Sequence, residues 1–191
     1  MNKAVFLDRD GVINPLVYNL MTGAYESPHM PEDFSLYPYV ERALRRLKDA
    51  GFLNIIVSNQ PSFAKGKTSL ENIQEIEKML SDFSKEHGEL IDAAYYCYHH
   101  PNGIVPAYTG NCSCRKPGTL FLQQAAKRFL LNASKCWLIG DRDSDVLCGS
   151  NFGCRTIKID HFHAEKSREN VKADYHAANL EEAVNQIIKG D

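Results

Sequence analysis

The sequence lacks a long hydrophobic run, and it lacks an excess of charge of either sign. The apolar run 4–7 is too short for a secretory signal, and no run approaches the roughly 18 apolar residues of a membrane span. Lysine plus arginine number 22 and aspartate plus glutamate 24, so the formal net charge is −2. A near-neutral chain has no bulk attraction for nucleic acid or anionic lipid. We therefore expect a cytoplasmic protein that binds neither.

The sequence also lacks internal repeats, low-complexity tracts and linkers. Its 191 residues correspond to about one domain, and its 43% hydrophobic and 24% charged residues are typical of globular proteins. This composition argues against wholesale disorder and against a small scaffold built on disulfides. We expect a single domain over residues 1–191 that works as a monomer.

Short apolar runs alternate with amphipathic stretches along the chain. The runs 4–7, 52–58, 92–98, 136–139 and 156–159 predict strands, and the stretches 39–50, 69–87, 119–131 and 180–189 predict helices. This order predicts an α/β fold with a parallel sheet and helices on both faces. Residues 15–38, which contain several prolines, are expected to form a long irregular surface loop.

Acidic residues follow directly after two of the predicted strands. Asp8 and Asp10 come after the first strand, two positions apart, so they share one face of an extended chain. Asp141 follows the strand 136–139 and would join them if the two strands are neighbours. Carboxylates held this close need a cation or a proton between them, and a divalent hard metal fits that need. One such motif alone is more often a solvated turn.

Complementary groups follow two further strands. Ser58 and Asn59 stand at the end of the predicted strand 52–58. Their hydroxyl and amide groups can donate to a phosphate oxygen. Arg115 and Lys116 precede the predicted helix 119–131, and cations near a helix N-terminus attract anions. Each feature is weak alone, but their order at successive strand ends indicates one polar site.

Four residues near these motifs have less specific interpretations. Asp145 would lie in the first turn of a helix, where a carboxylate favours the helix dipole. A capping role and a functional role are equally compatible with this position. We expect Asp143 to face solvent. His161 and His163 have the spacing of a metal-binding pair, but no third ligand is near in the sequence, so we expect a surface strand end.

The cysteines divide into two groups. Cys97 and His99 end the third predicted strand, and Cys112 and Cys114 follow after a loop, so each pair can face one way. Together they form a Cys₃His set suited to a closed, structural Zn²⁺ site. The alternative to a metal site is three unrelated thiols and two surface histidines. We expect His100 to point away from the Cys₃His set. Three further cysteines are expected in the core as small apolar groups: Cys136, Cys148 and Cys154.

The segments FLDRDGVIN, VSNQ, CRKPG and LIGDRDSD resemble the four ordered motifs of the haloacid dehalogenase (HAD) superfamily of phosphohydrolases. DRDGVIN, with C-x-H and C-x-C-R-K-P, is similar to the D,D-heptose 1,7-bisphosphate phosphatases. The resemblance covers nearly the whole chain. It implies a three-layer αβα Rossmann-like HAD core with a central parallel sheet, no large cap domain and an inserted zinc-binding loop, 97–114.

The same resemblance implies a Mg²⁺-dependent phosphatase that forms an aspartyl-phosphate intermediate. Asp8 would be the nucleophile, and Asp10 would protonate the leaving oxygen and then activate water. Mg²⁺ would bind the carboxylates of Asp8 and Asp141 and the backbone carbonyl of Asp10. The implied substrate is a small phosphorylated sugar, with the C7 phosphate of D-glycero-D-manno-heptose 1,7-bisphosphate as the leading candidate.

Further roles are implied for residues at the other strand ends. Ser58 and Lys116 would hold the phosphoryl group during catalysis. Asn59, Arg115 and Arg142 would contact phosphate or the rest of the substrate. Because the zinc loop leads directly into Arg115 and Lys116, we expect Zn²⁺ to position these two cations.

Two departures from the family pattern concern the substrate rather than the chemistry. The second motif usually continues Asn-Gln-Ser-Gly, but Pro61 stands here and has no N–H to donate to phosphate. Lys65 and Lys67 are close enough in sequence to replace it. The segment 15–38 is longer than the family pattern predicts, and it would face the non-reacting end of the substrate.

Two alternatives stay open. The first is a histidinol-phosphate phosphatase, a close relative, although the long loop 97–114 favours the heptose type. The second is a non-catalytic zinc-binding module with a degenerate core. That class predicts a basic surface and no paired aspartates, whereas this sequence has the aspartates and no charge excess.

Overall fold

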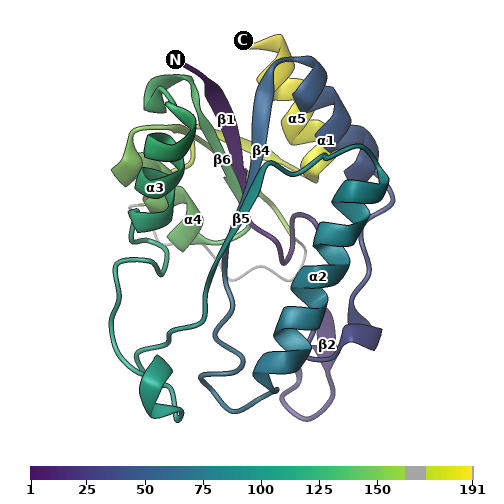
Figure 1. Cartoon of the computed structure of the whole chain (residues 1–191), viewed down its shortest axis with the longest axis vertical. Coiled ribbons are helices and arrows are strands. Elements are labelled where there is room, and N and C mark those ends of the chain that lie inside the picture. Colours follow the sequence, from purple (N-terminus) through teal and green to yellow (C-terminus); the bar gives the residue numbers. More distant parts are fainter. Residues whose placement is uncertain (162–170, 191) are drawn as a thin grey trace.

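The computed structural model describes residues 1–161 and 171–190. The main strands are β1 (Lys3–Leu7), β4 (Phe52–Asn59), β5 (Ala93–Cys97), β6 (Trp137–Gly140), β7 (Arg155–Ile159) and β8 (Tyr175–Ala177). The helices are α1 (Val40–Asp49), α2 (Leu70–Glu86), α3 (Leu120–Phe129), α4 (Asp143–Phe152) and α5 (Leu180–Lys189). The strands form one parallel sheet in the order β5-β4-β1-β6-β7-β8 (Figure 1). Within the described ranges, no helix combines the length and the apolar character needed to cross a membrane.

The sheet is apolar on both faces because helices cover both (Figure 1). Along β1, Val5 and Leu7 pack into one buried cluster, whereas Ala4 and Phe6 pack into the other. The first cluster includes residues of α1, α2 and α5, and the second includes residues of α3 and α4. The predicted three-layer αβα fold is therefore confirmed.

The structure differs from the expectation for residues 15–38. β2 (Val17–Asn19) and β3 (Ala24–Glu26) form an antiparallel hairpin, and a short 3₁₀ helix, η1 (Pro31–Asp33), follows it. The hairpin turn is closed by a hydrogen bond from Gly23 N to Asn19 O, with Gly23 at a φ of +64°. None of the six strand residues is buried, so the sequence shows no apolar alternation there.

A further short strand, β8, was absent from the sequence-based expectation. It joins the edge of the sheet beside β7, and two of its three residues are exposed. Only one of its residues, Ala177, packs into the core, which explains why hydrophobic periodicity did not predict it. His163 lies outside the described residues.

The loops at the carboxyl ends of the strands gather at one end of the molecule, opposite both termini (Figure 1). The hairpin, the loop 60–69 and the loop 98–119 all lie there. Two backbone donors tie the last two loops together: Ile104 N and Val105 N donate to Ala64 O at 2.6 and 3.3 Å. The order of strands reverses between β1 and β6, so ligands are expected at this end, beside those two strands.

We predict that Leu44→Ala lowers the free energy of unfolding by about 2–5 kcal/mol, because this α1 side chain is fully buried and its loss leaves a cavity. Leu20→Ala is the matched control, since Leu20 is 87% exposed, and its effect should stay within about 0.5 kcal/mol. Urea denaturation followed by circular dichroism measures both. Equal midpoints for the two variants would contradict this assignment of the core.

Candidate active site

Asp8 and Asp141 stand at the ends of the adjacent strands β1 and β6. The strand pairing continues to the site, because Asp8 N donates to Ile139 O at 2.9 Å. Lys116 reaches the same point from the loop before α3. Its Nζ lies 3.0 Å from Asp8 Oδ1 and 2.5 Å from Asp145 Oδ1, and it donates to Val57 O at 2.7 Å. β1 and β6 are neighbours, which is the condition under which Asp141 was expected to join Asp8 and Asp10.

Three buried carboxylates converge around this ammonium group. Ligand oxygens of Asp8, Asp141 and Asp145 all lie within 4.8 Å of one another. Burial and the charges of Asp8 and Asp145 raise the pKa of Asp141 to about 8, and burial also raises the pKa of Asp8. Asp141 Oδ1 is buried and accepts no hydrogen bond from the described part of the chain. Since one ammonium cannot neutralise three carboxylates, these residues fit a divalent cation with oxygen ligands.

Asp10 is held by a different set of groups, all buried. Arg9 donates to Asp10 Oδ1 through Nε at 3.1 Å and through Nη2 at 2.9 Å. Asn14 Nδ2 and Gln60 Nε2 donate to the two carboxylate oxygens at 3.0 and 2.6 Å. Burial opposes ionisation, but Arg9 and these hydrogen bonds outweigh it and lower the pKa of Asp10. In the free pocket Asp10 is therefore a carboxylate with a fixed orientation.

Ser58 and Asn59, at the end of β4, occupy different positions. The Ser58 hydroxyl is buried and accepts a hydrogen bond from Gln60 Nε2 at 3.0 Å. The Asn59 side chain forms two hydrogen bonds with the backbone of Lys116. Its Oδ1 accepts from Lys116 N at 3.0 Å, and its Nδ2 donates to Lys116 O at 3.2 Å. The amide of Asn59 thus positions Lys116, besides lining the cavity described below.

Two glycines permit the close approach of these elements. Gly11, after β1, has a φ of +82°, and a Cβ there would lie 2.7 Å from Asp141 Oδ2. A Cβ on Gly140, the last residue of β6, would overlap the side chain of Asp145. Any larger residue at either position would displace a carboxylate of the cluster.

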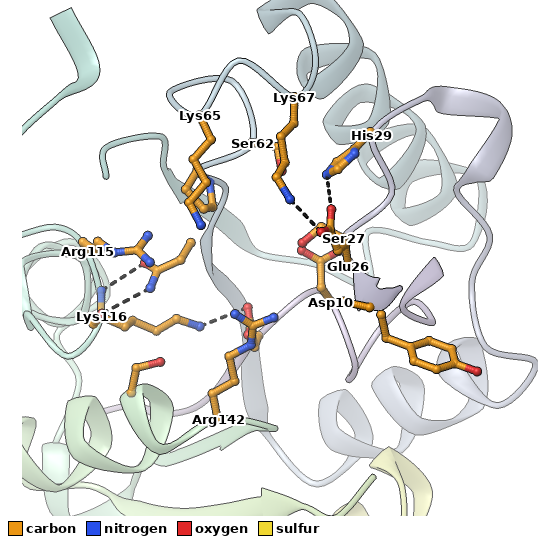
Figure 2. A pocket seen from close by; sticks show the side chains of 16 residues that line it. Asp10, Glu26, Ser27, His29, Ser62, Lys65, Lys67, Arg115, Lys116 and Arg142 are labelled. Atoms are coloured by element: carbon orange, nitrogen blue, oxygen red, sulfur yellow. Dashed lines mark hydrogen bonds and ion pairs between the residues drawn. The ribbon is translucent and has the colours of Figure 1, made fainter. Parts of the chain in front are cut away.

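A cavity of about 270 Å³ opens in front of these groups (Figure 2). Of the predicted site residues, it is lined by Asp8, Asp10, Asn59, Arg115, Lys116 and Arg142. The wall away from Lys116 is formed by β3 and the residues after it, together with the loop 60–69. Arg115, Lys116 and Arg142 lie at one side of the view, and Glu26, His29 and Lys67 lie at the other (Figure 2).

The four predicted zinc ligands form one cluster. The sulfur of Cys97 lies 3.5 Å from Cys112 Sγ and 3.3 Å from Cys114 Sγ, and those two sulfurs are 3.2 Å apart. His99 Nδ1 is 3.7 Å from Cys114 Sγ. These converging soft donors fit a tetrahedral metal. His100 is not part of the cluster, since its Nδ1 accepts a hydrogen bond from Asn102 N. The remaining cysteines are buried in the core, as expected: Cys136, Cys148 and Cys154.

Two minor expectations were wrong. Asp143 does not simply face solvent, because its Oδ1 pairs with Lys158 Nζ at 2.8 Å and its side chain is 19% exposed. His161 lies just beyond the end of β7, at a strand end as expected, but it is not fully at the surface. It is partly buried, and its Nε2 lies 2.6 Å from Gly11 O, beside the carboxylate cluster.

Gln60 and Glu26 were not singled out from the sequence, whereas Asp145 was given equal weight as a helix cap and as a functional residue. Asp145 combines both of its possible roles, because it pairs with Lys116 and also accepts from Arg142 N at the start of α4. Gln60 follows Ser58 by two positions, and that spacing could have placed both on one face. Glu26 lies in the unpredicted hairpin, where no pattern in the sequence indicated a role.

A family model and two solved structures show which class of fold the chain has. A family model described as HAD-hydrolase-like matches residues 113–183. The crystal structure of D,D-heptose 1,7-bisphosphate phosphatase from B. bronchiseptica, complexed with magnesium and phosphate, covers all of both chains with a TM-score of 0.74 and 20% identity. A Mesorhizobium loti protein described as a HAD-like phosphatase gives a TM-score of 0.77 at 22% identity, covering 98% of this chain and 87% of its own. The fold is that of the HAD-like hydrolases.

Two relatives with similar sequences show the family to which the chain belongs. The D-glycero-alpha-D-manno-heptose-1,7-bisphosphate 7-phosphatase of Photorhabdus laumondii is 33% identical over 88% of this chain and 90% of its own. The D-glycero-D-manno-heptose-1,7-bisphosphate 7-phosphatase of Chlorobaculum tepidum is 31% identical over 98% of this chain and 95% of its own. The chain belongs to this family of heptose-bisphosphate phosphatases and is a phosphatase.

We predict that the affinity of the metal-free protein for Mg²⁺ rises with pH up to about 8 and is flat above it. Asp141 holds a proton below that pKa, and the proton must leave before the carboxylate binds a cation. The affinity should approach a tenfold rise per pH unit well below the pKa, at about one proton per site. Calorimetric titration with MgCl₂ between pH 6 and 9 measures this, and an affinity independent of pH would contradict it.

Proposed function

We propose that this phosphatase removes the C7 phosphate of D-glycero-D-manno-heptose 1,7-bisphosphate in a Mg²⁺-dependent reaction. The observation that carries the proposal is the carboxylate of Asp8, buried beside Lys116 and two further carboxylates at the floor of a basic cavity. The names of the relatives supply the sugar. The long loop 97–114, which carries the Cys₃His cluster, favours the heptose type over the histidinol-phosphate type.

In the proposed reaction Asp8 attacks phosphorus, and the bond to the sugar oxygen breaks. Asp10 gives that oxygen a proton and then takes one from the water that hydrolyses the aspartyl-phosphate, which restores Asp8. Asp10 is a carboxylate in the free pocket, and the negative charge of a bound phosphate favours its protonated form. Lys116 and Ser58 would hold the phosphoryl oxygens at this end of the cavity.

Asp8, Asp141 and the backbone carbonyl of Asp10 would hold Mg²⁺, with Asp145 a further carboxylate beside them. When bound, the ion supplies positive charge that offsets the repulsion between an anionic nucleophile and an anionic phosphate. The Cys₃His cluster would hold a structural Zn²⁺, since four protein ligands leave no open position. The loop carrying the cluster contacts Arg115, whose Nη1 donates to His99 O at 3.3 Å.

The cations of the cavity favour a bisphosphate over histidinol phosphate. Lys65, Arg115 and Arg142 lie where the non-reacting part of a substrate would sit. Glu26, the carboxylate of the far wall, is paired with Lys67 at 2.6 Å and is not free to receive an amine. We also propose that the chain acts as a single-domain, cytoplasmic monomer. Its near-neutral charge favours neither nucleic acid nor an anionic membrane as a partner.

We predict that Asp8→Asn lowers kcat/KM by at least about 10³-fold, because the amide cannot attack phosphorus. The measurement is Mg²⁺-dependent phosphate release from the heptose bisphosphate, with histidinol phosphate assayed beside it. Asp49→Asn, which changes an exposed aspartate at the end of α1, is the matched control and should keep wild-type rates. Phosphate release by Asp8→Asn at an undiminished rate would exclude Asp8 as the nucleophile. Faster turnover of histidinol phosphate by the wild type would assign the alternative substrate.

We predict about one zinc ion per chain by metal analysis, falling well below half in Cys112→Ser. Lys116 is anchored by Asn59, Asp8 and Asp145, whereas Arg115 contacts the zinc loop itself. Loss of zinc should therefore raise KM by a larger factor than it lowers kcat. His100→Ala removes a neighbouring imidazole outside the cluster and should leave the zinc content unchanged. Full zinc occupancy in Cys112→Ser would remove this cluster as the site.

A further inference from the structure

The far wall of the cavity carries an acidic residue that the sequence did not indicate. Glu26, at the end of β3, accepts hydrogen bonds from Lys67 Nζ at 2.6 Å, Thr22 Oγ1 at 2.9 Å and Asn19 Nδ2 at 3.3 Å. His29 Nε2 lies 3.5 Å away, and the Glu26 side chain is only 15% exposed. Burial opposes its charge, but the bonds from Lys67, Thr22 and Asn19 outweigh burial and lower the pKa of this carboxyl. Glu26 is therefore a charged group that faces Lys67 inside the cavity (Figure 2).

The cations nearer to Lys116 are less closely paired with carboxylates. Across residues 1–161 and 171–190, no carboxylate lies within ion-pair distance of Lys65 or Arg115. Arg142 has one partner, Asp141, at 3.9 Å, and the Arg142 side chain is 59% exposed. Burial and the nearby positive charges of Lys67, Arg115 and Arg142 lower the pKa of Lys65, as expected for crowded cations. An anionic group of a ligand would relieve that repulsion.

The wall around Glu26 is suited to neutral polar groups instead. Ser27, His29 and Ser62 line it and offer hydroxyl and imidazole groups. Burial lowers the pKa of His29, so this imidazole is neutral at neutral pH and adds no positive charge. With Lys67 balanced by Glu26, the wall presents donors and acceptors for sugar hydroxyls but little net charge.

We propose that Glu26 is a specificity-determining residue: by neutralising Lys67, it directs the second phosphate of a bisphosphate substrate toward Lys65 and Arg115 and leaves the β3 wall to hydroxyl groups. The inference rests on the proposed function, because it assumes that the cavity receives a sugar bisphosphate. It assigns a role to the hairpin, since β3 carries Glu26 and the turn supplies Thr22. Removing the carboxylate would turn Lys67 into a second attractive cation.

The test compares ligand pairs that differ by one phosphate. The pairs are the heptose 1,7-bisphosphate with the heptose 7-phosphate, and fructose 1,6-bisphosphate with fructose 6-phosphate, each as a competitor of p-nitrophenyl phosphate hydrolysis. The preference for the bisphosphate is the inhibition constant of the monophosphate divided by that of the bisphosphate. In Glu26→Gln this ratio should rise about tenfold, equivalent to about 1.4 kcal/mol. In Lys67→Met, the unbalanced carboxylate should lower the same ratio. The double variant Glu26→Gln/Lys67→Met should return it toward the wild-type value.

The outcomes separate a charge effect from a structural one. Asp82→Asn removes the carboxylate of an exposed pair on α2 and should leave the ratios unchanged. If Glu26 only stabilises the hairpin, both ligands of each pair should bind more weakly by the same factor in all Glu26 and Lys67 variants. An unchanged ratio of inhibition constants would overturn the proposal. If the wild type hydrolyses neither heptose ligand, the proposed substrate fails, whereas the fructose pair still reports whether Glu26 controls the preference.

Discussion

The ion pairs of Lys116 hold the candidate active site together. A buried ammonium is costly unless it is paired and hydrogen-bonded, and Lys116 meets both conditions through Asp8, Asp145 and Val57 O. These contacts join β1, β4, α4 and the loop before α3 at one point. The same ammonium keeps the neighbouring carboxylates close, although it cannot neutralise all of them. The excess negative charge is what makes the cluster suitable for a divalent cation, so the metal-binding property and the packing of the strand ends have one cause.

Loops linked to one another enclose the substrate side of the site, since residues 1–161 and 171–190 contain no large cap domain. The loop 98–119 contacts the loop 60–69 through the bonds from Ile104 N and Val105 N to Ala64 O. Phe63 and Tyr108 also pack edge to face, with ring centroids 5.2 Å apart. Lys67 then continues the chain of contacts to Glu26 on the hairpin. Direct contacts that do not involve Lys116 therefore connect the loop of the Cys₃His cluster with the far wall of the cavity.

The sequence was informative where side chains are buried or where strand ends carry charge. The apolar runs gave the central strands because both faces of the sheet are covered, and Asp8, Asp10 and Asp141 could be grouped because parallel strands end at one edge. The hairpin was not predictable, since its strand residues are not buried and its pairing depends on the backbone and on Asn19. Glu26 could not be assigned because its partner Lys67 is 41 positions away. Asn59 lines the cavity, but its hydrogen bonds to the backbone of Lys116 are tertiary contacts that no local pattern contains.

The two sides of the cavity differ in what supports them, and this difference separates chemistry from recognition. Asp8, Asp10 and Lys116 are held by strands and by buried hydrogen bonds, so their positions do not depend on the loop that carries Glu26. Lys65 and Lys67 lie in a loop supported by other loops, where Pro61 replaces the serine of the family pattern. Substitutions on that side alter charge and shape around the sugar while leaving the carboxylate cluster intact. In the proposed function, the charges of Lys65, Lys67 and Glu26 therefore select the substrate, whereas the charges of the aspartates and Lys116 govern the reaction.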